Sequence, residues 1–365
     1  MKANKKIYLI LIVLLCTALS CGKSNNPVDE PVTNGFDKTA MLTNYADNLI
    51  IPGYTDLQQK LQLLTPAVNT FLTAPTTLNQ QAMLQVFKTA YLSFEKVSFT
   101  QFGPAETILY TNFMNTLPAT TNDNSDLQKI EANISSGSYN LSQNITVNQQ
   151  GFPALDYLLF SANTVQQFSA ANSANRKKYV QDILARMQDL TDHVLSSWKN
   201  SYRAQFIANT KSDAGSPIGY MVNQFAYEMD QLKGPRIGWP FGKQSGGLIF
   251  ENKCEGYYSK TSLALAIENL SSLKAYYIGA GSGKSFSAYL TALGKDQLNQ
   301  SILTYFDNAI NKLKAVPDPL SASLTNNKTA VDAAYKEIQI LLTVLKTDLA
   351  SALSVRITYV DNDGD

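Results

Sequence analysis

The chain has 365 residues, of which 44% are hydrophobic and 16% are charged, so it is long enough for one large or two ordinary domains with a sizeable core. Its 30 basic and 29 acidic residues give a formal net charge of +1. No basic patch stands out along the sequence, and this balance argues against a nucleic-acid partner.

The first 20 residues resemble a bacterial lipoprotein signal peptide. Three lysines precede an apolar stretch at residues 7–15, which is too short to span a membrane, and small residues lead to Cys21. This pattern predicts that Cys21 carries a lipid and that residues 21–36 are a flexible tether. We therefore expect a periplasmic protein anchored to the outer membrane, with a plain cleaved secretory signal as the alternative.

Residues 37–213 show the hydrophobic period of amphipathic helices and are expected to form an N-terminal helical bundle. Pro52 is expected to end or kink the first helix, and the Pro-Thr-Thr at 75–77 to separate the next two. The polar stretch 118–150 is expected to be largely loop, with a short helix near 127–134. The apolar positions that define the period are Leu42, Tyr45 and Leu49, then Tyr54, Leu57, Leu61 and Leu64, then Met83, Phe87, Tyr91 and Phe94, and finally Tyr179, Ile183, Met187, Leu190, Val194 and Trp198.

Residues 151–160 (GFPALDYLLF) are expected to be a loop that turns into an apolar helix. Pro153 should hold Phe152 extended and itself suit the first helical position. Asp156 would then fall in the first turn, where the unpaired N–H groups and the helix dipole favour a carboxylate.

Residues 214–365 are expected to form a C-terminal helical bundle, with the boundary at the Ala-Gly-Ser-Pro of 214–217. The period predicts helices near 220–232, 262–277, 298–313 and 331–353, and the glycine- and proline-rich segment 234–242 reads as an ordered loop. Only 355–360 alternates like a strand. The sequence therefore predicts an all-α fold of two helical-bundle domains.

Several of these stretches resemble the imelysin family. Residues 151–156 match its Gly-x-His-x-x-Glu signature with Pro153 in place of the histidine and Asp156 in place of the glutamate. Further blocks at 45–54, 94–104, 234–242 and 255–279 extend the resemblance over roughly residues 40–350. It implies two bundle-like helical domains with a polar site between them. Founding members are described as insulin-cleaving membrane peptidases and others as periplasmic iron-uptake or iron-regulated proteins, in which the signature histidine and glutamate are the proposed metal ligands.

The same resemblance nominates the residues of a site. Four polar residues match the family's site between the domains, and two basic residues in or just after the glycine-proline loop are the nearest candidates to neutralise them or to bind an anionic ligand. With Pro153, the ligand-binding candidates are Glu95, Pro153, Asp156, Arg236, Lys243, Glu255 and Ser259, and the candidate metal ligands are Asp156 and Glu255.

Metal-dependent peptidase chemistry has little support in the residues. Pro153 offers no donor atom, the His-Glu-x-x-His signature is absent, and the single histidine, His193, could pair with Asp189 or simply lie on the surface. Ser259 has no visible histidine base. We therefore expect a protein that binds a metal ion such as iron, a metal complex or a small polar ligand. The alternative is a structural lipoprotein that binds an envelope protein partner, and catalytic activity is left open.

Three further features are expected to carry no chemistry. The segment 279–285 resembles a phosphate-binding loop, but Ile278 stands where the first glycine is needed and a helix precedes it. The acidic residues 361–365 begin like a calcium loop that lacks its closing glutamate. Cys254 has no partner for a disulfide and is expected to be a packed free thiol.

Overall fold

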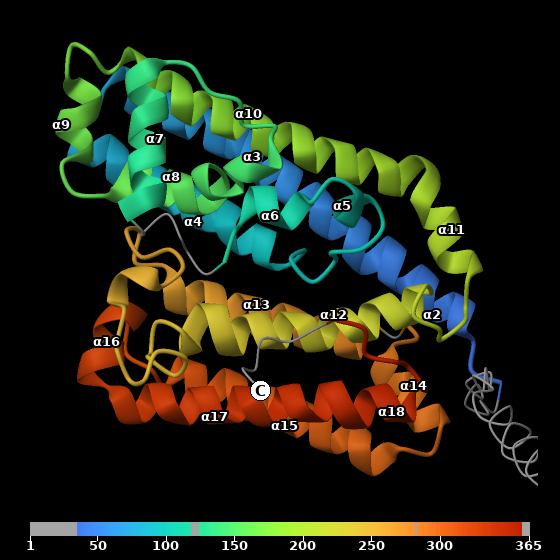
Figure 1. Cartoon of the computed structure of the whole chain (residues 1–365). Coiled ribbons are helices and arrows are strands. Elements are labelled where there is room, and N and C mark those ends of the chain that lie inside the picture. The colour runs from blue at the N-terminus through green and yellow to red at the C-terminus, as the bar shows by residue number, and fades with distance from the viewer. Residues whose placement is uncertain (1–34, 118–123, 282, 360–365) are drawn as a thin grey trace, which may run out of the picture.

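The computed structural model describes residues 35–117, 124–281 and 283–359, and these segments fold entirely into helices and turns, with no strand (Figure 1). The all-α fold is confirmed. The signal peptide, Cys21, most of the tether and the acidic C-terminus lie outside the described residues. Phe36, at the end of the predicted tether, stacks on Tyr289 with a ring separation of 4.8 Å. No helix in the described segments has the length and apolarity needed to cross a bilayer.

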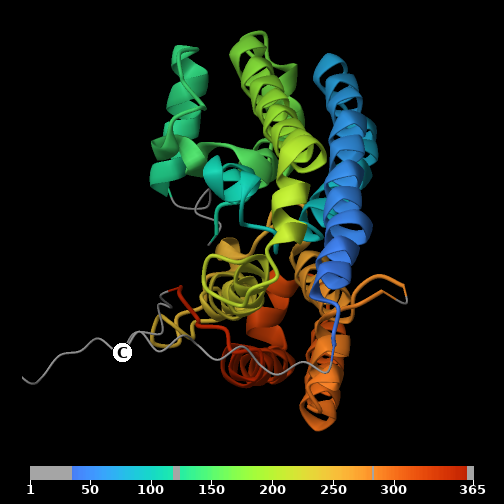
Figure 2. The same ribbon diagram turned by 90° about the vertical axis from the view of Figure 1, so that its right-hand side faces the viewer.

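The first half of the chain is built around a long helical hairpin. The helices α3 and α4 pack side by side, and α10 covers the other side of α3 (Figures 1 and 2). The elements of this half are α2 (Lys38–Tyr45), η1 (Ala46–Ile50), α3 (Ile51–Thr73), α4 (Thr77–Glu95), α5 (Pro104–Thr107), α6 (Tyr110–Met114), α7 (Asn124–Ser136), η3 (Asn144–Gln149), α8 (Gly151–Phe160), α9 (Thr164–Ser169), α10 (Ala174–Ser197), η4 (Trp198–Tyr202) and α11 (Arg203–Ala208).

The second half packs beneath the first, as the yellow-to-red part of the ribbon (Figure 1). Helix α15 packs on α13 and α17, and α13 also packs on α4, which joins the two halves. The elements of this half are α12 (Pro217–Gln231), η5 (Leu232–Gly238), η6 (Glu251–Lys253), α13 (Ser262–Ile278), α14 (Phe286–Ala292), α15 (Asp296–Lys314), α16 (Leu320–Asn326), α17 (Lys328–Val344), η7 (Leu345–Leu349) and α18 (Ala350–Ala352). Residues 213 and 214, between which the sequence predicts a domain boundary, lie between α11 and α12, and the boundary itself stays a prediction.

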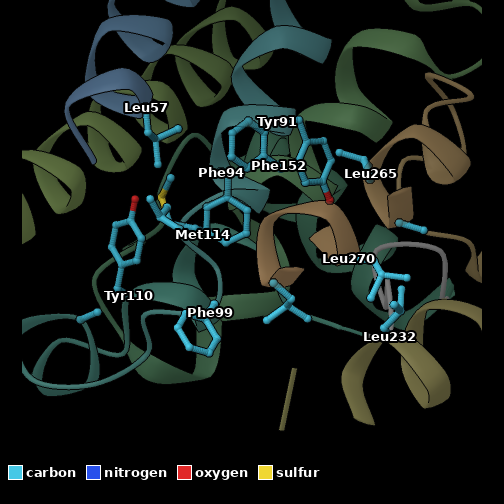
Figure 3. Packing of buried hydrophobic residues seen from close by; sticks show 14 of the residues in the cluster. Leu57, Tyr91, Phe94, Phe99, Tyr110, Met114, Phe152, Leu232, Leu265 and Leu270 are labelled. Carbon is cyan, nitrogen blue, oxygen red and sulfur yellow. The ribbon is translucent and has the colours of Figure 1, made fainter. Parts of the chain in front are cut away.

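The hydrophobic core is one continuous cluster that runs through both halves. Aromatic rings dominate it where α4, α6 and α8 meet (Figure 3). Phe152 stacks on Tyr91 with ring centroids 4.3 Å apart and also contacts Phe94 at 5.6 Å. These contacts fix α8 against α4, because stacked and tilted aromatic pairs add directional attraction to the burial of their area.

Prolines interrupt the helices less than the sequence suggests. Pro52 does not end the first helix, because the chain passes from α2 through the π-helical turn η1 directly into α3, with Pro52 in the first turn of α3. A proline there gives up a backbone donor that the first turn of a helix does not need. The segment 234–242 is likewise not a simple loop, since α12 continues as the π-helix η5 with Pro235 inside it.

The segment 355–360, which alternates like a strand, forms no strand in its described residues, 355–359. Instead of a neighbouring strand, this segment meets the side chain of Asn223 on α12, which donates to the Arg356 carbonyl at 2.9 Å and accepts from the Thr358 N–H at 2.7 Å. One side-chain amide thus supplies the hydrogen bonds that a partner strand would have made, and alternation alone does not create a sheet.

Candidate functional site

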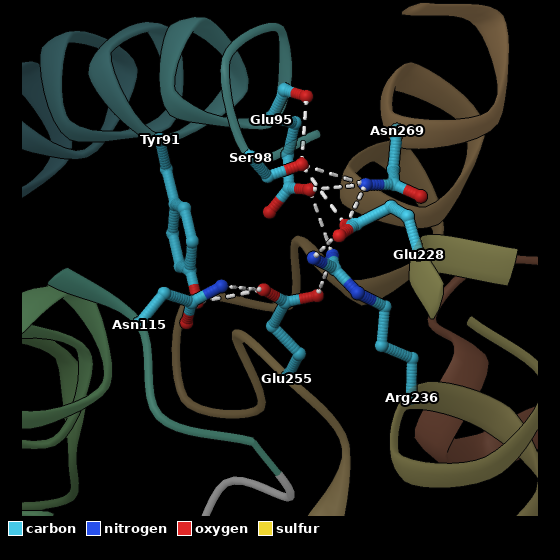
Figure 4. A network of polar contacts seen from close by, with 8 residues as sticks. All are labelled: Tyr91, Glu95, Ser98, Asn115, Glu228, Arg236, Glu255 and Asn269. Atoms are coloured by element: carbon cyan, nitrogen blue, oxygen red, sulfur yellow. Dashed lines mark hydrogen bonds and ion pairs between the residues drawn. The ribbon is translucent and has the colours of Figure 1, made fainter. Parts of the chain in front are cut away.

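A buried ion-pair network occupies the centre of the molecule, where α4, α12 and the segment before α13 meet (Figure 4). The Arg236 guanidinium lies between three carboxylates. Its Nη1 is 2.8 Å from Glu95 Oε2 and 2.6 Å from Glu255 Oε2, and its Nη2 is 3.4 Å from Glu228 Oε1. All four side chains are 3% exposed or less. Three acidic groups therefore face one cation in surroundings that are almost closed to bulk solvent.

Local helix geometry brings these residues together. Glu95 is the last residue of α4 and follows the buried stripe of Tyr91 and Phe94, so its carboxylate points inward with them. Glu228 lies on the buried face of α12, and the π-helix η5 that follows carries Arg236 back toward it. A π-helical segment inside a longer helix is a frequent feature of functional sites.

Two neutral side chains complete the upper part of the network. The Asn269 amide of α13 donates to Glu228 Oε1 at 2.6 Å and to Glu95 Oε2 at 3.0 Å. Ser98 donates to Glu228 Oε1 at 2.9 Å. On the other side, Asn115 donates to Glu255 Oε1 at 2.7 Å. The network thus joins α4 and the residues after α6 in the first half to α12, η5 and α13 in the second.

Several buried polar atoms of the network have no hydrogen-bond partner among the described residues. They are Glu95 Oε1, Glu228 Oε2, Asn269 Oδ1 and Arg236 Nε. Each unpaired buried polar group costs about 1–3 kcal/mol, and more where the group is charged. Three of the four are acceptors. What the network lacks is therefore mainly hydrogen-bond donors and positive charge.

The shifts in pKa follow from burial and from this shortage of positive charge. Burial raises the pKa of the Glu95 carboxyl well above its ordinary value, and the Arg236 guanidinium opposes that rise only in part, while Glu255 adds to it. For Arg236, burial alone would lower the pKa, but the surrounding carboxylates raise it overall. Arg236 is therefore a permanent cation, and Glu95 binds a proton more tightly than an exposed glutamate does.

Asp156 supports the neighbouring loop instead of capping its own helix. Helix α8 begins at Gly151, two residues before Pro153, so Phe152 is already helical and Asp156 lies beyond the first turn. The expectation of an N-terminal acid is therefore wrong. Its carboxylate accepts the backbone N–H groups of Tyr258 and Ser259, both at 2.9 Å. Burial raises the Asp156 pKa to about 6, and those donors oppose the rise.

Two glycines allow the close approaches that this arrangement needs. At Gly151 the φ angle is +74°, and a Cβ atom would lie 2.3 Å from the Met114 carbonyl oxygen. At Gly256 the φ angle is +58°, and a Cβ atom would lie 2.3 Å from Thr261 Oγ1. Any other residue would force α8 away from α6, or open the turn that presents its N–H groups to Asp156.

A small cavity of about 60 Å³ reaches the network from between α6 and α12. A cavity of this volume has room for a few water molecules or for a ligand of similar size. The residues that line it, nearly all polar, are Gln101, Thr111, Asn112, Asn115, Thr116, Leu117, Tyr227, Glu228, Gln231 and Arg236.

The structure brings most of the nominated site residues into one region. Glu95, Arg236 and Glu255 share the network, and the charge of Glu255 also acts on Asp156. Ser259 lies in the loop that Asp156 holds, where its hydroxyl is 3.3 Å from the Gly256 carbonyl and 2.9 Å from Thr261 Oγ1.

Other nominated residues lie apart from the network or offer it no donor. Lys243 pairs with Asp332 at 2.6 Å and lies over the rings of Phe241 and Tyr335. Pro153 is buried within α8. His193 is exposed on α10 and, within the described segments, makes no ion pair with Asp189. Cys254 is a buried free cysteine, as expected, and burial raises the pKa of its thiol.

Sequence reasoning missed Glu228, Asn115 and the hydroxyl of Tyr91, which lies 3.0 Å from Glu255 Oε1. Glu228 did carry a signal. It occupies the apolar stripe of its helix, between Phe225 and Met229, and a charged residue at such a position needs a buried partner. Asn115 had no signal, because it follows a short helix within a polar stretch.

The residues present do not fit a bound metal ion. Among the described residues, no group of three or more histidine, cysteine, aspartate or glutamate side chains is placed to hold one. Both oxygens of Asp156 accept backbone N–H groups, and both oxygens of Glu255 already have donors. The position that a cation would take between the three glutamates is filled by the Arg236 guanidinium.

Comparisons with known proteins agree with this architecture. A family model described as Imelysin matches residues 50–347. A protein named iron-regulated protein A from Synechococcus elongatus is 22% identical over 333 residues, which is 87% of this chain and 85% of that protein.

Two crystal structures share the fold. One is of a Parabacteroides distasonis protein named for iron-regulated protein A, with a TM-score of 0.69 and 17% identity over 89% of this chain and 98% of that one. The other is of an imelysin-like protein from Psychrobacter arcticum, with a TM-score of 0.70 and 18% identity over 88% of this chain and 97% of that one.

Proposed function

This chain belongs to the imelysin family, and we propose that it is a ligand-binding member whose central network takes up a small cationic ligand. The observation that carries the proposal is the imbalance of charge in that network. Three buried carboxylates face one guanidinium, and Glu95 and Glu228 each keep one oxygen without a donor. A cation that also donates hydrogen bonds would supply both the positive charge and the hydrogen-bond donors that the network lacks.

The size of the cavity limits the ligand. With about 60 Å³ beside Glu228 and Arg236, the site suits an ammonium-sized group or a short amine. A metal complex of the size of haem does not fit this space. Of the three ligand classes that the sequence leaves open, the small polar ligand therefore has the most support.

Binding should be coupled to release of a proton. Burial and the neighbouring carboxylates, Glu228 among them, raise the Glu95 pKa, so a cation held beside Glu228 lowers that pKa and favours the ionised form of Glu95. Affinity is then expected to rise with pH until the pH reaches the Glu95 pKa of the ligand-free protein.

The proposal also covers the location of the protein in the cell envelope and a role related to iron. The pattern of residues 1–21 supports a lipoprotein whose body lies in the periplasm, anchored to the outer membrane through Cys21. A relative named iron-regulated protein A supports a role related to iron, which would be seen as a change in the amount of this protein when cells are starved of iron.

Hydrolysis is a weaker candidate. The Ser259 hydroxyl contacts the Gly256 carbonyl and the Thr261 hydroxyl, and its side chain also interacts with the Asp156 carboxylate. Ser259 has no histidine base, because His193 is exposed on α10. A second function has a specific observation in its favour: the network and Asp156 join the two halves through buried and partly buried contacts. In this second function the network holds the two halves together in a structural lipoprotein that binds an envelope protein partner.

Titration calorimetry separates the two functions. The purified full chain is titrated with ammonium, methylammonium, calcium, zinc and ferrous ions in two buffers of different ionisation enthalpy, which reveals any proton release. Glu228→Gln removes one excess charge and keeps the shape, so it should abolish binding of the small cations. Glu337→Gln, on the half-buried surface of α17, is the matched control and should leave binding unchanged. If none of these ions binds, the structural role of the network becomes the better account.

A further inference from the structure

A second and larger depression lies on another side of the contact between the two halves. It has a volume of about 370 Å³ and runs between the face of η1 and α3 and the face of α13, so we name it the α3–α13 groove. None of its lining residues belongs to the Arg236 network. Its volume falls in the range of about 300–1,000 Å³ that is usual for small-molecule sites.

Residues at helical spacing line both walls of the groove. Leu49, Pro52 and Asp56 follow one another at three- and four-residue intervals on one helical face, and Glu268, Ser272 and Ala275 do so on α13. The π-helical turn η1 and Pro52 lie side by side at this wall, and a π-helical turn is wider than an α-helical one.

The groove has a charged end and an apolar end, because the two helices run in opposite directions there. Near the start of α3, the ring of Tyr276 stacks on Tyr45 at 6.4 Å. At the opposite end, Lys96 lies 3.6 Å from Asp56, and the neighbour of Glu268, Asn269, reaches α4. Asp56, Lys96 and Glu268 therefore gather at one end, and Leu49, Ala275 and Tyr276 at the other.

The charged end carries two carboxylates and two lysines, but both lysines lie beside Asp56, and Glu268 is left without a partner among the described residues. Asp56 has partners, since Lys60 and Lys96 lie 3.7 and 3.6 Å from it and Ser93 donates to it at 2.7 Å. Glu268 is only half exposed, and in the described part of the chain it makes neither an ion pair nor a hydrogen bond. A half-buried carboxylate next to apolar surface favours a cation that brings its own apolar body.

We propose that the α3–α13 groove is a second binding site, which takes a small amphipathic molecule that carries a primary amine. The amine pairs with Glu268 at the charged end, and the apolar body covers Leu49 and Ala275, beside the buried ring of Tyr276. This site does not depend on the function proposed for the Arg236 network, because the two share no residue.

Binding of 2-phenylethylamine to the purified full chain tests the proposal, by calorimetry or by ligand-observed NMR. We expect saturable binding with a dissociation constant of about 1 mM or lower. The neutral 2-phenylethanol and the anionic 3-phenylpropionate have similar apolar bodies and should bind at least about tenfold more weakly. Equal binding of the amine and the alcohol, or no binding of the amine at that concentration, would overturn the proposal.

Two variants locate the site. Glu268→Gln should weaken amine binding about tenfold and leave the binding of the alcohol unchanged. Ala275→Trp fills the apolar end and should abolish binding of both, while Ala333→Trp on α17 controls for the effect of a new tryptophan on a helix surface. Glu228→Gln acts only on the Arg236 network and should leave amine binding in the groove intact. Amine binding that survives Ala275→Trp would show that the groove is not the site.

Discussion

Replacement of Glu95 by glutamine tests the electrostatic account of the central network directly. The change removes the titrating carboxyl but keeps its shape, and a glutamine oxygen can still accept from Arg236 Nη1 at 2.8 Å and from Asn269 Nδ2 at 3.0 Å. Burial raises the Glu95 pKa well above 4.5, so the folded protein keeps a proton there after the unfolded chain has lost it.

The sign and the size of the effect follow from proton linkage. Where the native state binds more protons than the unfolded state, the free energy of unfolding falls as pH rises, by up to about 1.4 kcal/mol for each pH unit and each proton. For Glu95 this window opens at its ordinary value of 4.5 and closes at its folded-state pKa. Each pH unit inside the window costs the natural protein on the order of 1 kcal/mol, and Glu95→Gln does not lose this stability.

The assay is urea unfolding followed by circular dichroism, for both proteins, at steps between about pH 5 and about pH 8. The free energy of unfolding of Glu95→Gln minus that of the natural protein should increase with pH. Contributions from Asp156 and from surface carboxylates are present in both proteins and cancel. Glu337→Gln should follow the natural protein at every pH. If the free energies of unfolding of Glu95→Gln and of the natural protein change with pH in parallel, Glu95 is ionised in the folded state and the reasoning is refuted.

Three further changes probe the same region. Arg236→Met removes the only cation of the network and should destabilise the protein by about 3–5 kcal/mol in urea unfolding, because three buried carboxylates lose their partner; a neutral or stabilising effect would contradict this. Phe152→Ala should cost about 3–5 kcal/mol by the same measurement, since its ring is fully buried against Tyr91; a loss below about 1 kcal/mol would mean that the site repacks. Pro153→His restores the signature imidazole, yet calorimetry with zinc should detect no tight site, because both Asp156 oxygens already accept N–H groups; submicromolar binding would show that Asp156 is free to leave the loop.

The helices themselves could be predicted well from the sequence, and their ends less well. A period of 3.6 in the apolar residues reports which face of a helix is buried, and that signal is strong in α10 and α17. Prolines misled the prediction at Pro52 and Pro235, because a π-helical turn lies beside one and contains the other. The short helix α16, which begins just after Pro319, lies between two predicted helices and was not itself predicted.

The candidate site could be nominated in part. Glu95, Arg236 and Glu255 were named from their resemblance to family blocks, yet nothing in their spacing, more than 130 residues apart for the first two, shows that they meet. Glu228 could have been suspected from its place on an apolar stripe. Asp156 was given the wrong local role, because a first-turn carboxylate is the usual interpretation when the start of a helix is read from a proline.

The sequence by itself determined the helical class, the kinship to the imelysin family and the loss of the signature imidazole, because each of these is written in local patterns of residue type. Only the tertiary structure decided that a guanidinium fills the space between three glutamates and that the Asp156 carboxylate is held by the backbone of a distant loop. The physical reason is that charge balance is a property of groups close in space, and burial makes each uncompensated charge costly whatever the distance along the chain.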